Sequence, residues 1–157
     1  MHILMCNDDG ILADGLRRLA SYLSQYYRIT VVAPANEQSA KSHALTTEIP
    51  LKLDAYNGED ENPRLYALTG TPSDCMKFGL SYLLSDDMPD LVISGINHGF
   101  NLGSDVLYSG TVSAAMESCF YGIPGLALSV ERYSTERGDE MHPFIHELIE
   151  KIYVKGQ

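Results

Sequence analysis

Two aspartates, Asp8 and Asp9, stand side by side directly after an apolar stretch near the start of the chain. Adjacent carboxylates repel each other, because two unit charges roughly 4 Å apart cost about 4 kcal/mol at an effective dielectric constant of about 20. A protein tolerates such a pair where the charges reach water, share a proton or hold a cation. Carboxylate oxygens suit a hard cation such as Mg²⁺, Mn²⁺ or Ca²⁺. The alternative is that one aspartate caps the helix that follows.

Two other loops carry polar residues that could join the aspartates. The stretch ANEQSAKSH at 35–43 follows an expected strand and contains Asn36 and Ser39. The stretch GINHGFNLG at 95–103 has three glycines, which let the backbone approach a ligand closely. It also contains Asn97 and Asn101, whose amide carbonyls are neutral ligands. Its glycine spacing is not that of the dinucleotide-binding motif, so a nicotinamide cofactor is not expected.

A third segment, YSGT at 108–111, is predicted to open a helix. Backbone N–H groups and the positive end of the helix dipole attract phosphate at such a position, which makes Ser109, Gly110 and Thr111 candidate phosphate-binding residues. An ordinary serine or threonine helix cap has the same pattern, so both readings stay open here. His98, in the glycine-rich stretch, is a candidate for proton transfer.

The elements that must position these residues alternate between strands and helices. Apolar and β-branched runs predict strands at 2–7, 28–33, 89–94 and 125–130. Helical spacing predicts helices from Leu12, from Thr71 as N-cap, at 111–121 and at 141–154. Residues 44–54 and 64–68 are expected to form a small extended hairpin.

Alternating strands and helices predict an α/β fold, a three-layer Rossmann-like sandwich with a mostly parallel sheet. Ligands bind to such sheets at the carboxyl ends of the strands, where the topology switches. The three polar loops all follow strands, so they are expected to converge on one edge of the sheet.

Length and composition exclude several classes of protein. The 157 residues show no internal repeat and are expected to form a single domain over 1–157. No apolar run approaches the roughly 20 residues of a membrane span, and no secretory signal is expected at the N-terminus. Three widely spaced cysteines fit free thiols in a cytoplasmic protein. The formal net charge of −10 argues against a nucleic acid polymer as partner.

Together these segments resemble the SurE family of stationary-phase survival proteins. The matching segments are NDDG at 7–10, PANEQSAKS at 34–42, GTPSDC at 70–75, SGINHGFNLGSDVLYSGTVSAAMES at 94–118 and ALS at 127–129. The resemblance implies a metal-dependent phosphatase of nucleoside 5′- and 3′-monophosphates, with some members acting on short polyphosphate. It also implies one divalent ion, Mg²⁺ or Mn²⁺ with Ca²⁺ also able to occupy the site. The implied ligands are Asp8, Asp9, Ser39 and Asn97.

The resemblance also suggests roles for the other candidates. Ser109, Gly110 and Thr111 correspond to the family's phosphate-binding segment, and Asn36 is expected to contact the substrate. Asp8 and Asp9 are expected to act in catalysis, with either a metal-bound water or an aspartate as the nucleophile. Family members are homodimers or tetramers and are longer, so this chain is expected to lack their C-terminal arm.

Two other functions stay open at this point. One is a non-catalytic fragment that only binds metal and nucleotide. The other is a phospho-acceptor receiver domain, which also carries an acidic pair after its first strand; Asp54 would then be the acceptor. A receiver needs a lysine after its last strand, whereas Val130 is followed here by Glu131 and Arg132. Hydrolysis of a phosphomonoester is therefore the favoured function.

Overall fold

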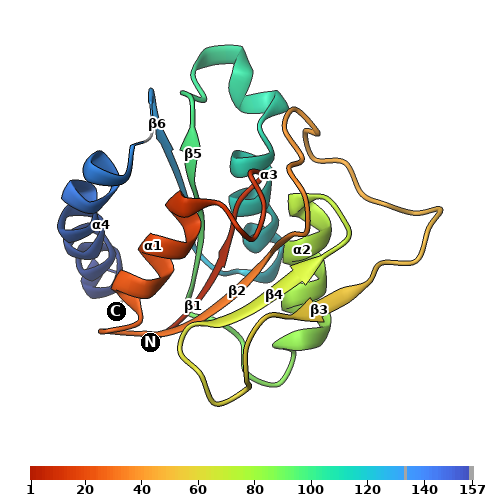
Figure 1. The fold of residues 1–157 in the computed structure, drawn as a ribbon, viewed down its shortest axis with the longest axis horizontal. Helices are drawn as coiled ribbons and strands as arrows, with labels where there is room; N and C mark the ends of the chain where they lie inside the picture. Colours follow the sequence, from red (N-terminus) through yellow and green to blue (C-terminus); the bar gives the residue numbers. More distant parts are fainter. Residues whose placement is uncertain (133, 156–157) are drawn as a thin grey trace.

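The computed structural model describes residues 1–132 and 134–155. Its centre is a six-stranded sheet in the order β3-β4-β2-β1-β5-β6 (Figure 1). All neighbouring strands are parallel except β3 and β4, which form the predicted hairpin. The strands are β1 His2–Cys6, β2 Arg28–Pro34, β3 Leu53–Ala55, β4 Arg64–Leu68, β5 Leu91–His98 and β6 Gly125–Val130.

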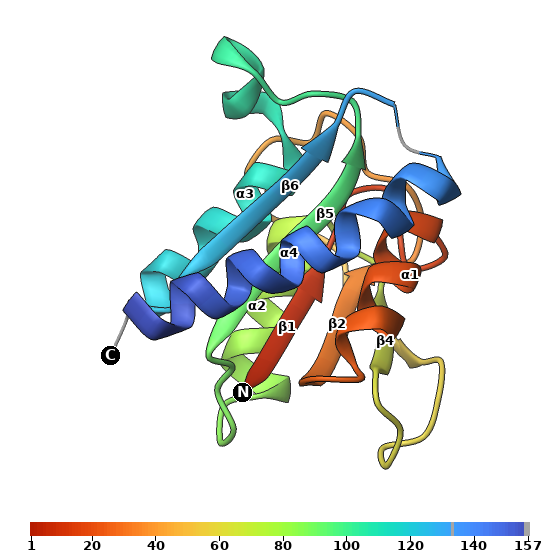
Figure 2. The same ribbon diagram turned by 90° about the vertical axis from the view of Figure 1, so that its left-hand side faces the viewer.

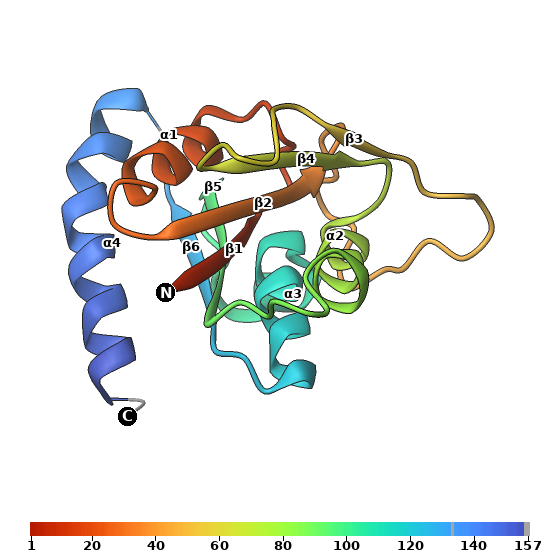
Figure 3. The same cartoon turned by 90° about the horizontal axis from the view of Figure 1, so that it is seen from below.

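Helices cover both faces of the sheet, which confirms the three-layer α/β prediction. α1 and α4 lie side by side on one face, and α2 and α3 lie on the other (Figures 2 and 3). None of the helices within the described ranges combines the length and apolarity needed to cross a membrane. The helices are α1 Asp14–Leu23, α2 Pro72–Phe78, α3 Gly110–Glu117 and α4 Thr135–Lys155, with shorter turns η1 Gly79–Leu83, η2 Gly103–Tyr108 and η3 Ser118–Tyr121.

The central strand β1 contributes to a separate core on each face. Successive side chains of a strand point to opposite faces, so Ile3 and Met5 pack with α1 and α4, whereas Leu4 and Cys6 pack with α2 and α3. These four side chains are completely buried. A run of consecutive apolar residues is what a strand covered on both faces requires.

The start of α2 has the capping arrangement that the sequence predicts. Thr71 Oγ1 accepts a hydrogen bond from the backbone N–H of Asp74 at 3.1 Å. The Asp74 carboxylate accepts in return from the backbone N–H of Thr71 at 2.9 Å. Two helix-end donors are thereby satisfied, which fixes the loop between β4 and α2.

The topology switches between β1 and β5. From β1 the chain builds β2 and β4 on one side, and it returns to build β5 and β6 on the other side. Cys6 of β1 is paired with Ser94 of β5, so the residues that follow both strands lie at the same edge of the sheet. This is where a ligand site is expected in a doubly wound sheet.

Most element ends lie within a few residues of the sequence-based prediction, and the helix expected at 111–121 divides into α3 and η3; three differences are larger. β5 extends to His98, because Asn97 and His98 find partners in Ser129 and Val130 of β6. Residues 44–52 form no strand, since side chains rather than a strand ladder hold this segment. α4 begins at Thr135 instead of residue 141 and contains Pro143 in its interior.

Candidate active site

The turn after β1 is built by Asn7 and Gly10. The buried Asn7 amide donates to the carbonyl oxygen of Gly10 at 3.0 Å and accepts from the Gly10 N–H at 3.1 Å. Gly10 has a φ of 101°, a left-handed conformation that glycine adopts with little strain. The next helix, α1, has Ala13 as its N-cap with no side-chain cap bond. Neither Asp8 nor Asp9 therefore caps it.

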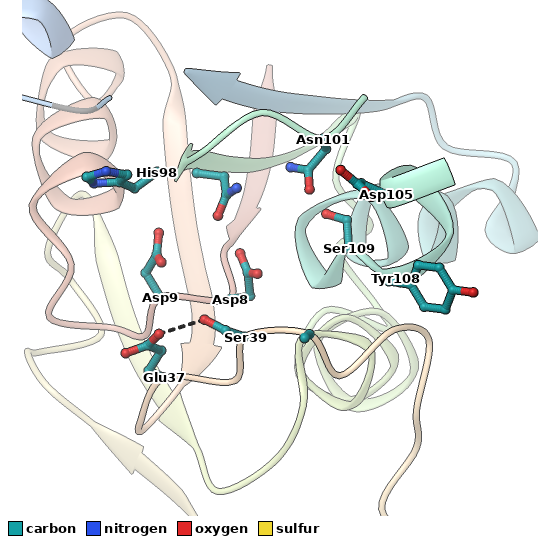
Figure 4. A pocket seen from close by; sticks show the side chains of 11 residues that line it. Asp8, Asp9, Glu37, Ser39, His98, Asn101, Asp105, Tyr108 and Ser109 are labelled. Carbon is teal, nitrogen blue, oxygen red and sulfur yellow. Dashed lines mark hydrogen bonds between the residues drawn. The ribbon is translucent and has the colours of Figure 1, made fainter. Parts of the chain in front are cut away.

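A cavity of about 500 Å³ opens at the carboxyl edge of the sheet (Figure 4). Three loops converge on it, which follow β1, β2 and β5. The cavity is lined by Asp8, Asp9, Ser39 and Asn97, and also by Glu37, Ala40, His98, Asn101, Asp105, Tyr108 and Ser109. The structure thus brings together the four residues that the family resemblance assigns to a metal ion.

The start of α3 packs against Asp8 and fixes the position of its side chain. Thr111 Oγ1 donates to Asp8 Oδ1 at 2.5 Å, and both side chains are buried. Gly110 permits this close packing, since a Cβ there would lie 2.9 Å from Asp8 Cβ and 3.1 Å from Pro72 Cγ. The sequence suggests Thr111 as a phosphate contact, but in the structure its hydroxyl is engaged by Asp8.

The neutral candidate ligands are held by their neighbours. Asn97 Nδ2 donates to the carbonyl of Gly99 at 2.9 Å, and its Oδ1 accepts no hydrogen bond from any described residue. Ser39 Oγ donates to Glu37 Oε1 at 2.6 Å, so its lone pairs stay available (Figure 4). The backbone N–H of Gln38 donates to the carbonyl of Asp8 at 2.8 Å, which joins the loops after β1 and β2.

The donor set fits a hard divalent cation. It combines two carboxylates with an amide oxygen and a hydroxyl oxygen, the ligands that Mg²⁺, Mn²⁺ and Ca²⁺ accept. Within residues 1–132 and 134–155, no group of three or more His, Cys, Asp or Glu side chains is arranged to hold a metal ion. The neutral oxygens of Ser39 and Asn97 would therefore be needed to complete the coordination.

The cavity concentrates negative charge. Burial raises the pKa of Asp8, although the hydrogen bond from Thr111 partly opposes this effect. Burial, the Asp8 carboxylate and the Glu37 carboxylate together raise the pKa of Asp9 to about 6. A cation at this position would favour the ionised form of both aspartates.

Asp9→Asn is expected to stabilise the metal-free protein at pH 8 by about 1 kcal/mol. The ordinary pKa of this carboxyl is 3.8 and the folded one about 6, so ionisation of Asp9 opposes folding increasingly as the pH rises through that window. A pKa difference of this size corresponds to at most about 3 kcal/mol, and solvent screening of the partly exposed side chain reduces it.

Thermal unfolding in EDTA at pH 8 and pH 5 checks this prediction, and the gain should be smaller at pH 5. Asp60→Asn, in the exposed turn before β4, is the matched control and should leave the midpoint unchanged. A wild-type protein that melts above Asp9→Asn at pH 8 without metal would contradict the expectation.

The candidate phosphate-binding residues Ser109, Gly110, Thr111 and Asn36 differ in where the structure places them. Ser109 lines the cavity and is also the N-cap of α3, because its Oγ accepts from the Val112 N–H at 3.2 Å. The first backbone N–H groups of a helix, here those of Gly110 and Thr111, have no acceptor within the helix. Asn36 is not brought to the aspartates and instead lines a separate cavity of about 270 Å³.

Several lining residues were not predicted as site residues, namely Glu37, Asp105 and Tyr108, whereas Asn101 was a candidate ligand beside Asn97. Each lies in one of the polar loops that follow a strand, and that position is the signal that could have found them. Asn101 Nδ2 also donates to Ser129 Oγ at 2.6 Å, which ties its loop to β6. Tyr108 points outward at the rim (Figure 4).

Comparison with known proteins decides the family. A family model described as survival protein SurE matches residues 3–156. The chain belongs to the SurE family. A SurE relative from Thermoanaerobacter sp. strain X514, named 5′-nucleotidase SurE, is 49% identical over 99% of this chain and 61% of its own length. A relative of the same name from Crocosphaera subtropica is 46% identical over 98% of this chain and 56% of its own length.

A solved SurE structure is similar as well. The crystal structure of the SurE protein from Aquifex aeolicus superposes with a TM-score of 0.80 at 37% identity, covering 96% of this chain and 60% of that chain. The resemblance to SurE and the Rossmann-like fold are thus confirmed. The chain spans 56% to 61% of the length of these SurE proteins.

Proposed function

We propose that this chain is a divalent-metal-dependent phosphomonoesterase that hydrolyses nucleoside 5′-monophosphates, and also 3′-monophosphates. The observation that carries the proposal is the convergence of Asp8, Asp9, Ser39 and Asn97 on one cavity beside the start of α3. SurE relatives that are named 5′-nucleotidase support the choice of substrate. Short polyphosphate would present the same terminal phosphoryl group and is included in the proposal.

The residues have separate roles in this proposal. Asp8, Asp9, Ser39 and Asn97 hold the ion, which is Mg²⁺ or Mn²⁺. When bound, such an ion polarises a phosphoryl oxygen and lowers the pKa of a coordinated water. Ser109 and the backbone N–H groups at the start of α3 bind the remaining phosphoryl oxygens. Thr111 keeps Asp8 in place through its hydrogen bond.

The role of Asn36 stays a prediction. It lines the smaller cavity together with Thr46 and Gly70, so a contact between Asn36 and the substrate would be made in that cavity. A cytoplasmic location is also proposed, because all three cysteines of the chain are free thiols.

The receiver alternative is not favoured by the structure. Asp54 lies exposed on the short edge strand β3 and forms an ion pair with Lys52 at 2.9 Å. It does not line the cavity that holds Asp8 and Asp9. A phospho-acceptor must reach the metal beside the acidic pair, and Asp54 is not placed to do so.

Phosphate release from a panel of nucleoside monophosphates, measured with Mn²⁺, with Mg²⁺ and with EDTA, tests the proposal. We expect release with either metal and loss of release in EDTA, because the carboxylates alone would repel the phosphate dianion. Re-addition of metal should restore the rate and show that EDTA did not unfold the protein. Binding of Mn²⁺ by calorimetry without any phosphate release would instead identify a non-catalytic binding fragment.

A further inference from the structure

Glu117 carries a buried carboxylate that the proposed chemistry does not use. Its side chain lies on the last turn of α3 and is 7% exposed. Its Oε2 accepts a hydrogen bond from His43 Nε2 at 2.7 Å. A buried carboxylate is stable only when it is paired, and His43, 74 positions away in the sequence, supplies the partner. This contact fixes the loop after β2 against α3.

The loop concerned is residues 35–52, which we call the serine loop because it carries Ser39. It contains no helix and no strand. Ser42 attaches it to the end of η2, since its backbone N–H donates to the carbonyl of Tyr108 at 3.2 Å and its Oγ donates to that of Leu107 at 2.9 Å. His43 is the next residue, so two attachments follow one another directly.

A second group of contacts attaches the serine loop to the start of α2. Thr46 donates from its backbone N–H and from Oγ1 to the two carboxylate oxygens of Asp74, at 3.0 and 2.6 Å. Thr71 Oγ1 donates to the carbonyl of Ala44 at 2.7 Å. The loop is therefore held at residues 42–46 and also at Gln38, whose backbone N–H donates to the Asp8 carbonyl at 2.8 Å, while the Ser39 side chain bonds only within the loop, to Glu37.

The backbone around Ser39 is strained. Ala40 has a φ of 56° and Ser42 a φ of 53°, which are left-handed values that residues with a Cβ rarely adopt. Such conformations persist only where surrounding contacts over-determine them. The contacts that do so here are those of Ser42 itself, with Leu107 and Tyr108, and that of His43, the residue after it.

We propose that His43 and Glu117 form a positioning pair that sets Ser39 relative to the start of α3. The role of Ser39 as a metal ligand rests on the proposed function. Ser109 is the N-cap of α3, and Thr111 in its first turn donates a hydrogen bond to Asp8. Glu117 lies in the last turn of the same helix. The pair therefore couples the serine loop to the helix that holds Asp8 and the phosphate segment, and neither residue touches the reacting groups.

His43→Ala is the first test, because His43 is one-third exposed and its removal leaves no large cavity. We expect the dissociation constant for Mn²⁺, measured by calorimetry, to rise about 10-fold, the lower end of the effect of losing a ligand's own hydrogen-bond partner, because His43 acts on Ser39 through the loop backbone. Limited proteolysis should cut within residues 35–52 faster than in the wild type. His43→Gln should restore most of both properties, because its Nε2 can donate to Glu117.

His146→Ala is the matched control. It removes another histidine that faces a glutamate, His146 Nε2 lying 3.9 Å from Glu150 Oε1 on α4. It should leave Mn²⁺ affinity and the cleavage of residues 35–52 unchanged. A purely structural effect of losing any histidine would instead appear in both alanine variants.

The proposal is overturned if His43→Ala binds Mn²⁺ and resists cleavage like the wild type, or if His43→Gln is as defective as the alanine variant. Should His43→Ala fail to unfold cooperatively, His43→Asn replaces it, since its side chain is too short to reach Glu117 and the same defects are expected. Neither readout needs nucleotide hydrolysis. A wild type without phosphatase activity would thus refute the proposed function while still testing the pair.

Discussion

Asp8→Asn is expected to lower metal-dependent phosphate release by about 10³-fold, which corresponds to about 4 kcal/mol of transition-state stabilisation. Asp8 is 6% exposed and faces the cavity beside Asp9. The amide keeps the shape of the side chain and can still accept the hydrogen bond from Thr111. The substitution therefore removes the charge that a cation would bind and little else. The rate at saturating metal and the dissociation constant for Mn²⁺ are the quantities to measure.

Asp105→Asn is the control for this substitution. Asp105 also lines the cavity but lies exposed on η2, outside the proposed ligand set. Because water and salt screen exposed charges, its loss should change the rate by less than about threefold. Equal losses in both variants would mean that the general negative charge of the cavity matters, and that Asp8 has no special role as a ligand.

Gly110→Ala is expected to lower activity by about 10²-fold, because a displacement of about 1 Å at a catalytic group has an effect of this size. The new Cβ would lie 2.9 Å from Asp8 Cβ and 3.1 Å from Pro72 Cγ, distances at which a neighbour must move. Neither neighbour is the flexible end of a long side chain. The free energy of unfolding should fall by about 1–3 kcal/mol, as is usual for overpacking.

The two effects are separated by measuring denaturant unfolding and steady-state kinetics on the same preparation. Gly58→Ala is the matched control, since its Cβ would meet only Glu61 Oε1 at 3.8 Å in an exposed turn. It should change the stability by less than about 0.5 kcal/mol and leave the rate unchanged. Normal activity in Gly110→Ala would show that the contact between α3 and Asp8 has no part in the chemistry.

The layers and the position of the site were predictable from the sequence because both depend on local patterns. Strand β1 is a run of apolar residues, and the polar residues after it, after β2 and after β5 had to share one edge of a parallel sheet. The end of β5 was not predictable in the same way. Glycine normally marks the end of a strand, but Gly95 is followed by Asn97 and His98, which pair with β6.

The contacts that hold the site together were also beyond sequence reasoning. Thr111 and Asp8 are 103 positions apart, and His43 and Glu117 are 74 positions apart. Nothing in the spacing of these residues indicates that they meet. The side chain of Thr111 has a chemistry that suits either a phosphate or a carboxylate, and only the packing of α3 against the loop after β1 decides between them.

Because β5 extends to His98, one side of the cavity belongs to the sheet, whereas the side formed by the serine loop has no regular structure. Asn97 is anchored in a ladder of backbone hydrogen bonds with β6, so its side of the cavity has a constant position. Ser39 lines the same cavity from a segment without regular structure. Under the proposed function, variation in the size of the leaving group would be accommodated by the sides of the cavity outside β5, among them the serine loop. If nucleoside monophosphates are the substrates, as proposed, changes in residues 35–52 should alter the tolerance toward different nucleosides more than changes in β5.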